Sequence, residues 1–196
     1  AQVSDAALVI IGRTAGEDQD TKAEPGSYLL TEKEEAMIRT VSRHFARTAV
    51  LLNVGNIIDM KWVEDCAPSA VLYVWQGGME GGNGAVDVLT GRVSPCGKLS
   101  DTIAASIEDY PSTAGFGDPY ENIYAEDIYV GYRYFETAAR DKVLYPFGFG
   151  LSYTEFAVTT EGFREEGEDI LLQVRVKNTG DLAGKEVVQV YANPPQ

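Results

Sequence analysis

The chain contains few cysteine and histidine residues. Its 196 residues include two cysteines, Cys66 and Cys96, and a single histidine, His44. So few sulfur and imidazole ligands exclude a disulfide framework and disfavour a zinc site. We therefore expect two free, mostly buried thiols, no metal and no cofactor.

Positive charge and long apolar runs are also scarce. Sixteen Lys and Arg residues stand against thirty Asp and Glu, which gives a formal net charge of −14. Nucleic acids and anionic membranes bind to basic surfaces, so we expect neither as a partner. No stretch approaches the ~18 uninterrupted apolar residues of a membrane-spanning helix. The sequence begins without Met and without the pattern of a signal peptide, so we expect a piece of a longer protein whose localisation stays open.

Apolar runs that alternate with helical patterns predict an α/β fold. Three runs predict buried strands: residues 6–11, 49–55 and 70–75. A helix is predicted over residues 31–45, because Thr31 and Glu34 fit a capping box and apolar residues recur at helical spacing. Shorter helices are predicted over residues 59–66 and 85–89. We expect an open, mainly parallel sheet sandwiched by helices, with right-handed crossovers.

The second half of the chain carries weaker patterns. Residues 101–124 lack periodicity and predict loop, whereas residues 129–135 are aromatic and alternate, which favours a strand. Residues 145–153 combine glycine with aromatics and predict irregular packing. Three later segments predict antiparallel strands: residues 156–160, 170–176 and 187–191. A sandwich of this type needs about seven strands. We therefore expect an α/β domain of residues 1–153, followed by a partial antiparallel β-sandwich of residues 154–196 with open strand edges.

The loop of residues 12–20 is the first candidate for chemistry. It leaves the carboxyl end of the first predicted strand, where ligand crevices of open parallel sheets lie. It contains Glu17, Asp18 and Asp20, and a carboxyl group can act as an acid or base where burial raises its pKa. On spacing alone, ordinary solvated loop acids are the simpler interpretation.

Other motifs favour structural roles. The glycine-rich residues 77–84 complete neither a G-x-G-x-x-G motif nor a P-loop, and Glu80 would repel phosphate. We interpret them as a tight turn, which disfavours a flavodoxin-like nucleotide binder. His44 lies within a predicted helix, and no G-x-S-x-G sequence accompanies it, so Ser-His-Asp catalysis is disfavoured. The aromatic residues of 129–135 and 147–153 suit a core better than a sugar-stacking surface.

Several segments, in this order, resemble the C-terminal part of glycoside hydrolase family 3 enzymes. The matching motifs are GED at residues 16–18, GSYLLT at 26–31, GMEGG at 78–82, DVLTG at 87–91, SPCGKL at 94–99, VGYRY at 130–134 and YPFGFGLSY at 145–153. Residues 176–180 and 184–188 are similar to the fibronectin type III-like domain of that family. The resemblance covers nearly the whole chain, and the motifs are specific when taken together.

The resemblance implies one half of a composite active site. In that family a TIM-like barrel carries the nucleophilic Asp, and a loop of the α/β domain lends the general acid/base. The matching carboxyl here is Glu17, which we predict as catalytic, with Arg13 and Asp18 of the same loop as substrate-binding residues. The family has Gly where this chain has Asp18 and Arg where it has Thr21, two departures that bear on the geometry of the loop.

A (β/α)₈ barrel needs about 200 residues or more, and only about three βα units are visible here. The resemblance therefore implies part of a retaining, exo-acting, β-glucosidase-like hydrolase that is catalytically silent alone. Its expected partners are the N-terminal barrel domain of the parent enzyme and an oligosaccharide or an aryl or alkyl glycoside. The alternative is a non-catalytic carbohydrate-binding or structural module, because the nucleophile is missing here. The sequence leaves the sugar and its linkage open.

Overall fold

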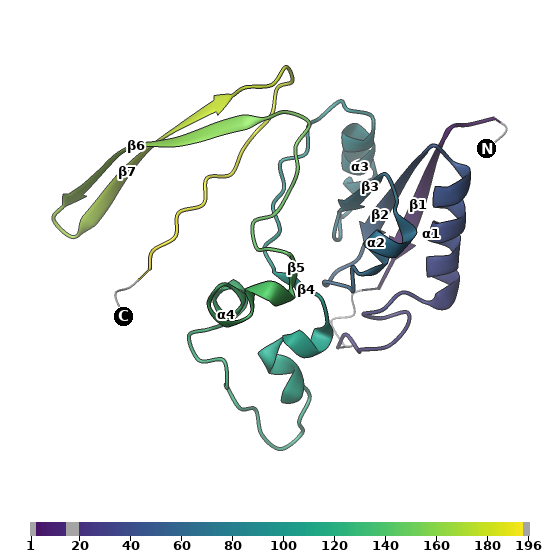
Figure 1. Cartoon of the computed structure of the whole chain (residues 1–196), viewed down its shortest axis with the longest axis horizontal. Helices are drawn as coiled ribbons and strands as arrows, with labels where there is room; N and C mark the ends of the chain where they lie inside the picture. Colours follow the sequence, from purple (N-terminus) through teal and green to yellow (C-terminus); the bar gives the residue numbers. More distant parts are fainter. Residues whose placement is uncertain (1–2, 15–19, 194–196) are drawn as a thin grey trace. The chain divides into compact units, whose positions relative to one another are not determined.

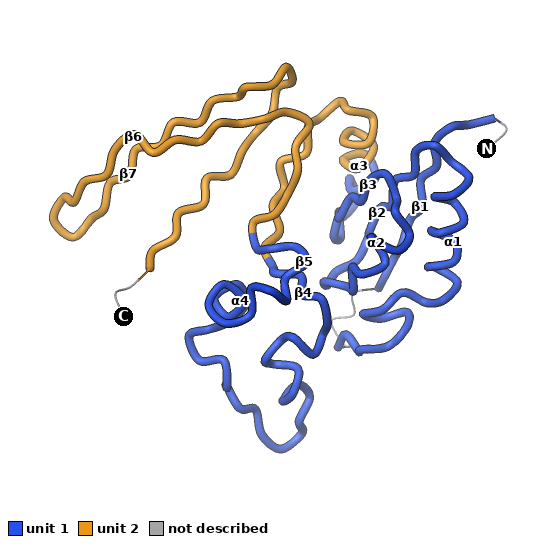
Figure 2. The backbone as a smooth tube through the Cα atoms, viewed as in Figure 1, with its two compact units in different colours: residues 1–82, 101–147 blue, residues 83–100, 148–196 orange. Residues whose placement is uncertain are grey.

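The computed structural model describes residues 3–14 and 20–193 (Figure 1). The chain divides into two compact units (Figure 2). The first unit contains residues 1–82 and 101–147, and the second contains residues 83–100 and 148–196. The expected domain boundary after residue 153 lies inside the second unit, and it stays a prediction.

A three-stranded parallel sheet forms the centre of the first unit. Its strands are β1 (Ala6–Gly12), β2 (Arg47–Asn53) and β3 (Ala70–Tyr73), in the order β1-β2-β3. The register pairs Gly12 with Asn53 and Leu52 with Tyr73, so the carboxyl ends of all three strands lie at one edge. The predicted α/β class with a parallel sheet is thereby confirmed.

Helix α1 (Glu32–His44) packs against β1, β2 and the short helix α2 (Trp62–Cys66) (Figure 1). Ile38 of α1 is fully buried, as are Ile11 and Leu52 in the sheet. The expectation that each strand is covered on both faces fails at β1. Its alternate residues Leu8 and Ile10 are 47% and 59% exposed, so the described residues leave that face of β1 largely uncovered.

The rest of the first unit is a small antiparallel pair with one helix. Strand β4 (Ile103–Ala104) pairs with β5 (Val143–Tyr145), and α4 (Tyr132–Ala138) precedes β5. Short 3₁₀ helices span Ile107–Asp109, Pro111–Ala114 and Arg140–Lys142.

The strand expected over residues 129–135 is therefore wrong. Gly131 has a φ of 61°, which ends an extended run, and α4 begins immediately after it. Phe135 and Ala139, one helical turn apart, are buried in a cluster with Ala104. Helical packing of the aromatic residues thus overrides their alternation in the sequence.

The second unit contains most of helix α3 (Gly81–Leu89) and a long hairpin. Its strands are β6 (Phe156–Glu166) and β7 (Asp169–Asn178), which pair antiparallel with an irregularity between Thr160 and Gly162. Both expected strands are confirmed and extend further than predicted. Together with the α/β sheet, the hairpin agrees with an α/β domain followed by a partial β-sandwich.

The third expected strand, residues 187–191, is wrong, because no strand of the described chain pairs with this segment. Side chains hold it instead. Lys98 forms an ion pair with Glu186 at 2.9 Å, and Gln189 donates a hydrogen bond to the carbonyl of Gly148 at 3.3 Å. Across residues 3–14 and 20–193, no helix is both long and apolar enough to cross a membrane.

Candidate functional site

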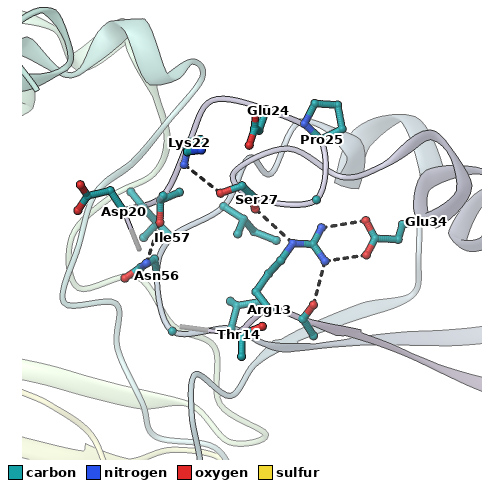
Figure 3. Close-up of a pocket in the computed structure, with 16 residues that line it drawn as sticks. Arg13, Thr14, Asp20, Lys22, Glu24, Pro25, Ser27, Glu34, Asn56 and Ile57 are labelled. Carbon is teal, nitrogen blue, oxygen red and sulfur yellow. Dashed lines mark hydrogen bonds and ion pairs between the residues drawn. The ribbon is translucent and has the colours of Figure 1, made fainter. Parts of the chain in front are cut away.

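A pocket of about 470 Å³ lies at the carboxyl ends of β1 and β2 (Figure 3). It is lined by residues 12–14 after β1, by residues 20–22 and 24–27 of the following loop, by residues 54–58 after β2, and by Glu34 of α1. A second, more open hollow of about 500 Å³ shares residues 12–14 and adds Asn53 and residues 76–78. Both cavities occupy the edge of the sheet at which open α/β folds bind ligands.

Two of the three predicted site residues, Glu17 and Asp18, lie outside the described residues. The described residues on either side of this stretch, Thr14 and Asp20, both line the pocket. The structure thus places only these two flanking residues at the pocket, and the roles of Glu17 and Asp18 stay predictions.

Arg13 follows β1 directly, and all five of its side-chain N–H donors are engaged. Its Nη1 donates to Glu34 Oε1 at 2.6 Å and to the carbonyl of Gly12 at 2.9 Å. Its Nη2 donates to Glu34 Oε2 at 2.8 Å and to the carbonyl of Leu29 at 3.4 Å, and its Nε donates to the carbonyl of Ser27 at 3.2 Å. A guanidinium has five N–H donors and no acceptor. The contacts therefore favour a positioning role over the expected contact with substrate.

Glu34 faces Arg13 from the first turn of α1 (Figure 3). The expected capping box is confirmed, because Glu34 accepts from the backbone N–H of Thr31 at 2.8 Å and donates its own N–H to Thr31 Oγ1 at 3.2 Å. The Arg13 guanidinium, assisted by the N–H and hydroxyl groups of Thr31, holds the pKa of Glu34 below its usual value. Glu34 is thus a carboxylate that joins the helix cap to the end of β1.

The loop after the undescribed stretch is tied down at several points. Asn56 Nδ2 donates to Thr21 Oγ1 at 2.7 Å, and the N–H of Lys22 donates to Ser27 Oγ at 2.9 Å. Thr21 stands where the family pattern has Arg. The chain therefore has a hydroxyl that accepts a hydrogen bond from Asn56 in place of a long, positively charged side chain. Asn56 was not among the predicted site residues, although a polar residue just beyond a buried strand is a signal that indicates such a site.

A buried carboxyl group lies just beyond the pocket lining. The Asp59 side chain is 11% exposed, its Oδ1 has no hydrogen-bond partner among the described residues, and Lys61 Nζ is 3.8 Å away. Burial raises the pKa of this carboxyl, and Lys61 opposes the rise. The hydroxyl of Tyr28, also buried, has no such partner either, and its pKa is raised mainly by burial. The sequence analysis did not single out these two groups.

The pocket lining offers mainly hydrogen-bonding groups. Within the described part of the chain, no cluster of three or more His, Cys, Asp or Glu side chains could hold a metal ion. The lining supplies hydroxyls, carboxylates and an amide, from Thr14, Asp20, Glu24, Ser27 and Asn56 among others. Such groups suit a ligand rich in hydroxyls. The cysteines are free, with Cys66 buried and Cys96 half-buried.

Solved structures with the same fold are β-glucosidases. The chain superimposes on a β-glucosidase from Paenibacillus barengoltzii with a TM-score of 0.87 and 56% identity, covering 91% of this chain and 20% of that one. It superimposes on β-glucosidase 3B from Thermotoga neapolitana, in complex with glucose, with a TM-score of 0.84 and 40% identity, covering 91% and 26%.

Sequence relatives agree. The chain is 56% identical to a β-glucosidase from Ruminococcus albus over 195 residues, which are 100% of this chain and 20% of the relative. It thus spans about a fifth of the length of that relative. The family model for the glycosyl hydrolase family 3 C-terminal domain matches residues 1–153. With its parallel sheet and its pocket at the strand ends, the chain belongs to glycosyl hydrolase family 3, as part of the C-terminal region of such an enzyme.

Proposed function

We propose that this chain supplies the general acid/base, Glu17, to a retaining, exo-acting β-glucosidase whose nucleophile lies in a barrel domain elsewhere in the parent protein. The observation that carries the proposal is the pocket at the ends of β1 and β2, with both described ends of the Glu17 segment in its lining. The β-glucosidase relatives support glycosides as the substrate class.

The chemistry requires two carboxyl groups about 5–5.5 Å apart in a retaining enzyme. The barrel Asp attacks the anomeric carbon and forms a glycosyl ester, while Glu17 protonates the departing glycosidic oxygen. In the second step Glu17 removes a proton from water, which hydrolyses the ester with net retention.

The test is the leaving-group dependence of hydrolysis by the full-length protein. We expect Glu17→Ala to lower kcat/KM on phenyl β-glucoside far more than on 2,4-dinitrophenyl β-glucoside, because an activated leaving group needs little acid assistance. Glu121→Ala, which removes an exposed carboxyl in another loop, is the control and should leave both rates within about twofold. Equal losses on both substrates in Glu17→Ala would remove Glu17 from the acid role.

A carbohydrate-binding module is the second candidate, because the pocket is polar and is built entirely within the first unit. Titration of the 196-residue chain with glucose separates the two functions. Saturable binding that is insensitive to Glu17→Gln, together with an unchanged leaving-group profile in the full-length Glu17→Ala protein, would favour a binding module.

A further inference from the structure

We propose that Arg13 and Glu34 form a positioning pair that sets the location of the acid/base loop relative to the sheet. The proposal rests on the proposed function, since it concerns the loop that carries Glu17. In this proposal Arg13 affects catalysis by positioning Glu17, and it does not contact the substrate directly.

The pair of Arg13 and Glu34 joins four separate segments. The guanidinium of Arg13 binds the carboxylate of Glu34 through two hydrogen bonds and also binds the carbonyls of Ser27 and Leu29, which belong to the far side of the loop. The backbone N–H of Arg13 donates to the carbonyl of Asn53 at 3.1 Å. One residue therefore connects the ends of β1 and β2, the returning loop and the start of α1.

Thr21 and Lys22, which follow the undescribed residues, are held by contacts of their own. Thr21 accepts a hydrogen bond from Asn56, and Lys22 is held by Ser27. In the sequence, Glu17 is the central residue of the five between Thr14 and Asp20. Arg13 precedes the undescribed residues and Thr21 follows them, and each is held by its own contacts. Loss of the Arg13 contacts therefore releases the side nearer to β1 and leaves the contact of Thr21 in place.

The pair of Arg13 and Glu34 is shielded from solvent and depends on a specific geometry. The side chains of Arg13 and Glu34 are 13% and 23% exposed, so the charges are only weakly screened by solvent. The planar fork of arginine matches a carboxylate with two parallel bonds, which a lysine ammonium cannot reproduce. A more exposed ion pair on the same helix, Arg39 with Glu35 at 2.6 Å, has the same residue types in an i, i+4 relation, and Arg39 also donates to the carbonyl of Asp65 at 3.1 Å. It provides a matched control.

The experiment uses the full-length protein with Arg13→Met, Arg13→Lys and the control Arg39→Met. A catalytic group displaced by about 1 Å can lose about 10²-fold in rate. We expect Arg13→Met to lower kcat/KM on phenyl β-glucoside by about 10- to 100-fold and on 2,4-dinitrophenyl β-glucoside by less than about threefold. Arg13→Lys should be intermediate, and Arg39→Met should match the unsubstituted protein on both substrates.

Further readouts separate positioning from other roles. The inhibition constant for glucose should stay within about twofold in Arg13→Met, because the sugar is not a partner of Arg13 in this proposal. The double variant Arg13→Met/Glu17→Ala should be no slower than Glu17→Ala alone, since both changes remove the same assistance. If the thermal melt shows that Arg13→Met does not fold, the same kinetic and inhibition measurements on Arg13→Lys test the proposal.

Several results would overturn the proposal. Equal losses on both substrates with a weaker glucose inhibition constant would indicate that Arg13 contacts the sugar. Similar losses in Arg39→Met would indicate general destabilisation of α1. If Glu17→Ala shows leaving-group dependence and the Arg13 variants do not, only the positioning pair fails. If Glu17→Ala itself shows none, the proposed function and the positioning pair fail together.

Discussion

At the scale of single residues, the contact between Arg13 and Glu34 links the residue after β1 to the first turn of α1. The sequence predicted half of this arrangement, because the Thr31 and Glu34 pattern of a capping box is local and depends on four residues. The other half joins residues 21 positions apart. Such a pairing depends on how the loop returns to the helix, and the spacing of charges along the chain carries no signal for it.

The lowered pKa of Glu34 gives the pair a dependence on pH. Because the folded pKa lies below the unfolded value of about 4.3, the stabilisation is complete above that value and is lost as the pH falls through the folded pKa. We expect Glu34→Gln to lower the free energy of unfolding by about 1.5–3 kcal/mol at pH 7. Below about pH 4 we expect the free energies of unfolding of the unsubstituted and the Glu34→Gln chains to become more similar.

Urea unfolding of the chain at pH 7 and pH 3 checks this expectation. Glu35→Gln is the control, because the pair of Glu35 with Arg39 is more than one-third exposed, and exposed pairs contribute about 0–1 kcal/mol. A Glu34→Gln effect that is unchanged between the two pH values would contradict the assignment.

At the scale of elements, the sequence predicted the positions of the three parallel strands and of α1 well, because continuous apolar runs and helical spacing are strong local signals. It failed at residues 129–135, where Gly131 and the burial of Phe135 produce α4. It also failed at residues 187–191, because an alternating pattern forms a strand only beside a partner strand. Both failures depend on contacts made by distant parts of the chain.

The turn before α3 provides a test at this scale. A Cβ atom on Gly77 would lie 2.5 Å from the Cα of Gly81, a backbone atom that can move only with its chain, whereas a Cβ on Gly84 within α3 meets nothing within 4 Å. We expect Gly77→Ala to destabilise the fold by about 1–3 kcal/mol and Gly84→Ala to stabilise it by about 0.5–1 kcal/mol. Urea unfolding measures both, and a shift of the two variants in the same direction would contradict this account of the turn.

At the scale of the whole molecule, the chain carries one side of the proposed active site. The sequence predicted the fold class, and the family match confirms the resemblance on which the site was predicted. Motifs identified the family because they recur in a fixed order. The contacts of Arg13 with Ser27 and Glu34, and the burial of Asp59, could not be predicted, since they depend on the three-dimensional course of the loops after β1 and β2.

The proposed location of the nucleophile, in a barrel domain elsewhere in the parent protein, leads to a prediction for the 196-residue chain. We expect the 196-residue protein to release no nitrophenol from nitrophenyl β-glucosides above the uncatalysed rate, because an acid/base without a nucleophile completes only half of the retaining mechanism. Absorbance assays at high protein concentration check this, with the full-length protein as the positive control. Robust hydrolysis that Glu17→Gln abolishes would show that the chain holds a complete site.

The most direct test of the acid/base role of Glu17 is azide rescue of the full-length Glu17→Ala protein with 2,4-dinitrophenyl β-glucoside. Azide is an anion and needs no general base to attack the glycosyl ester. We predict that azide raises the turnover and that the product is the β-glycosyl azide, with the configuration of the substrate retained. An absence of rescue, or an α-glycosyl azide formed by direct displacement, would contradict the assignment of Glu17 as the acid/base.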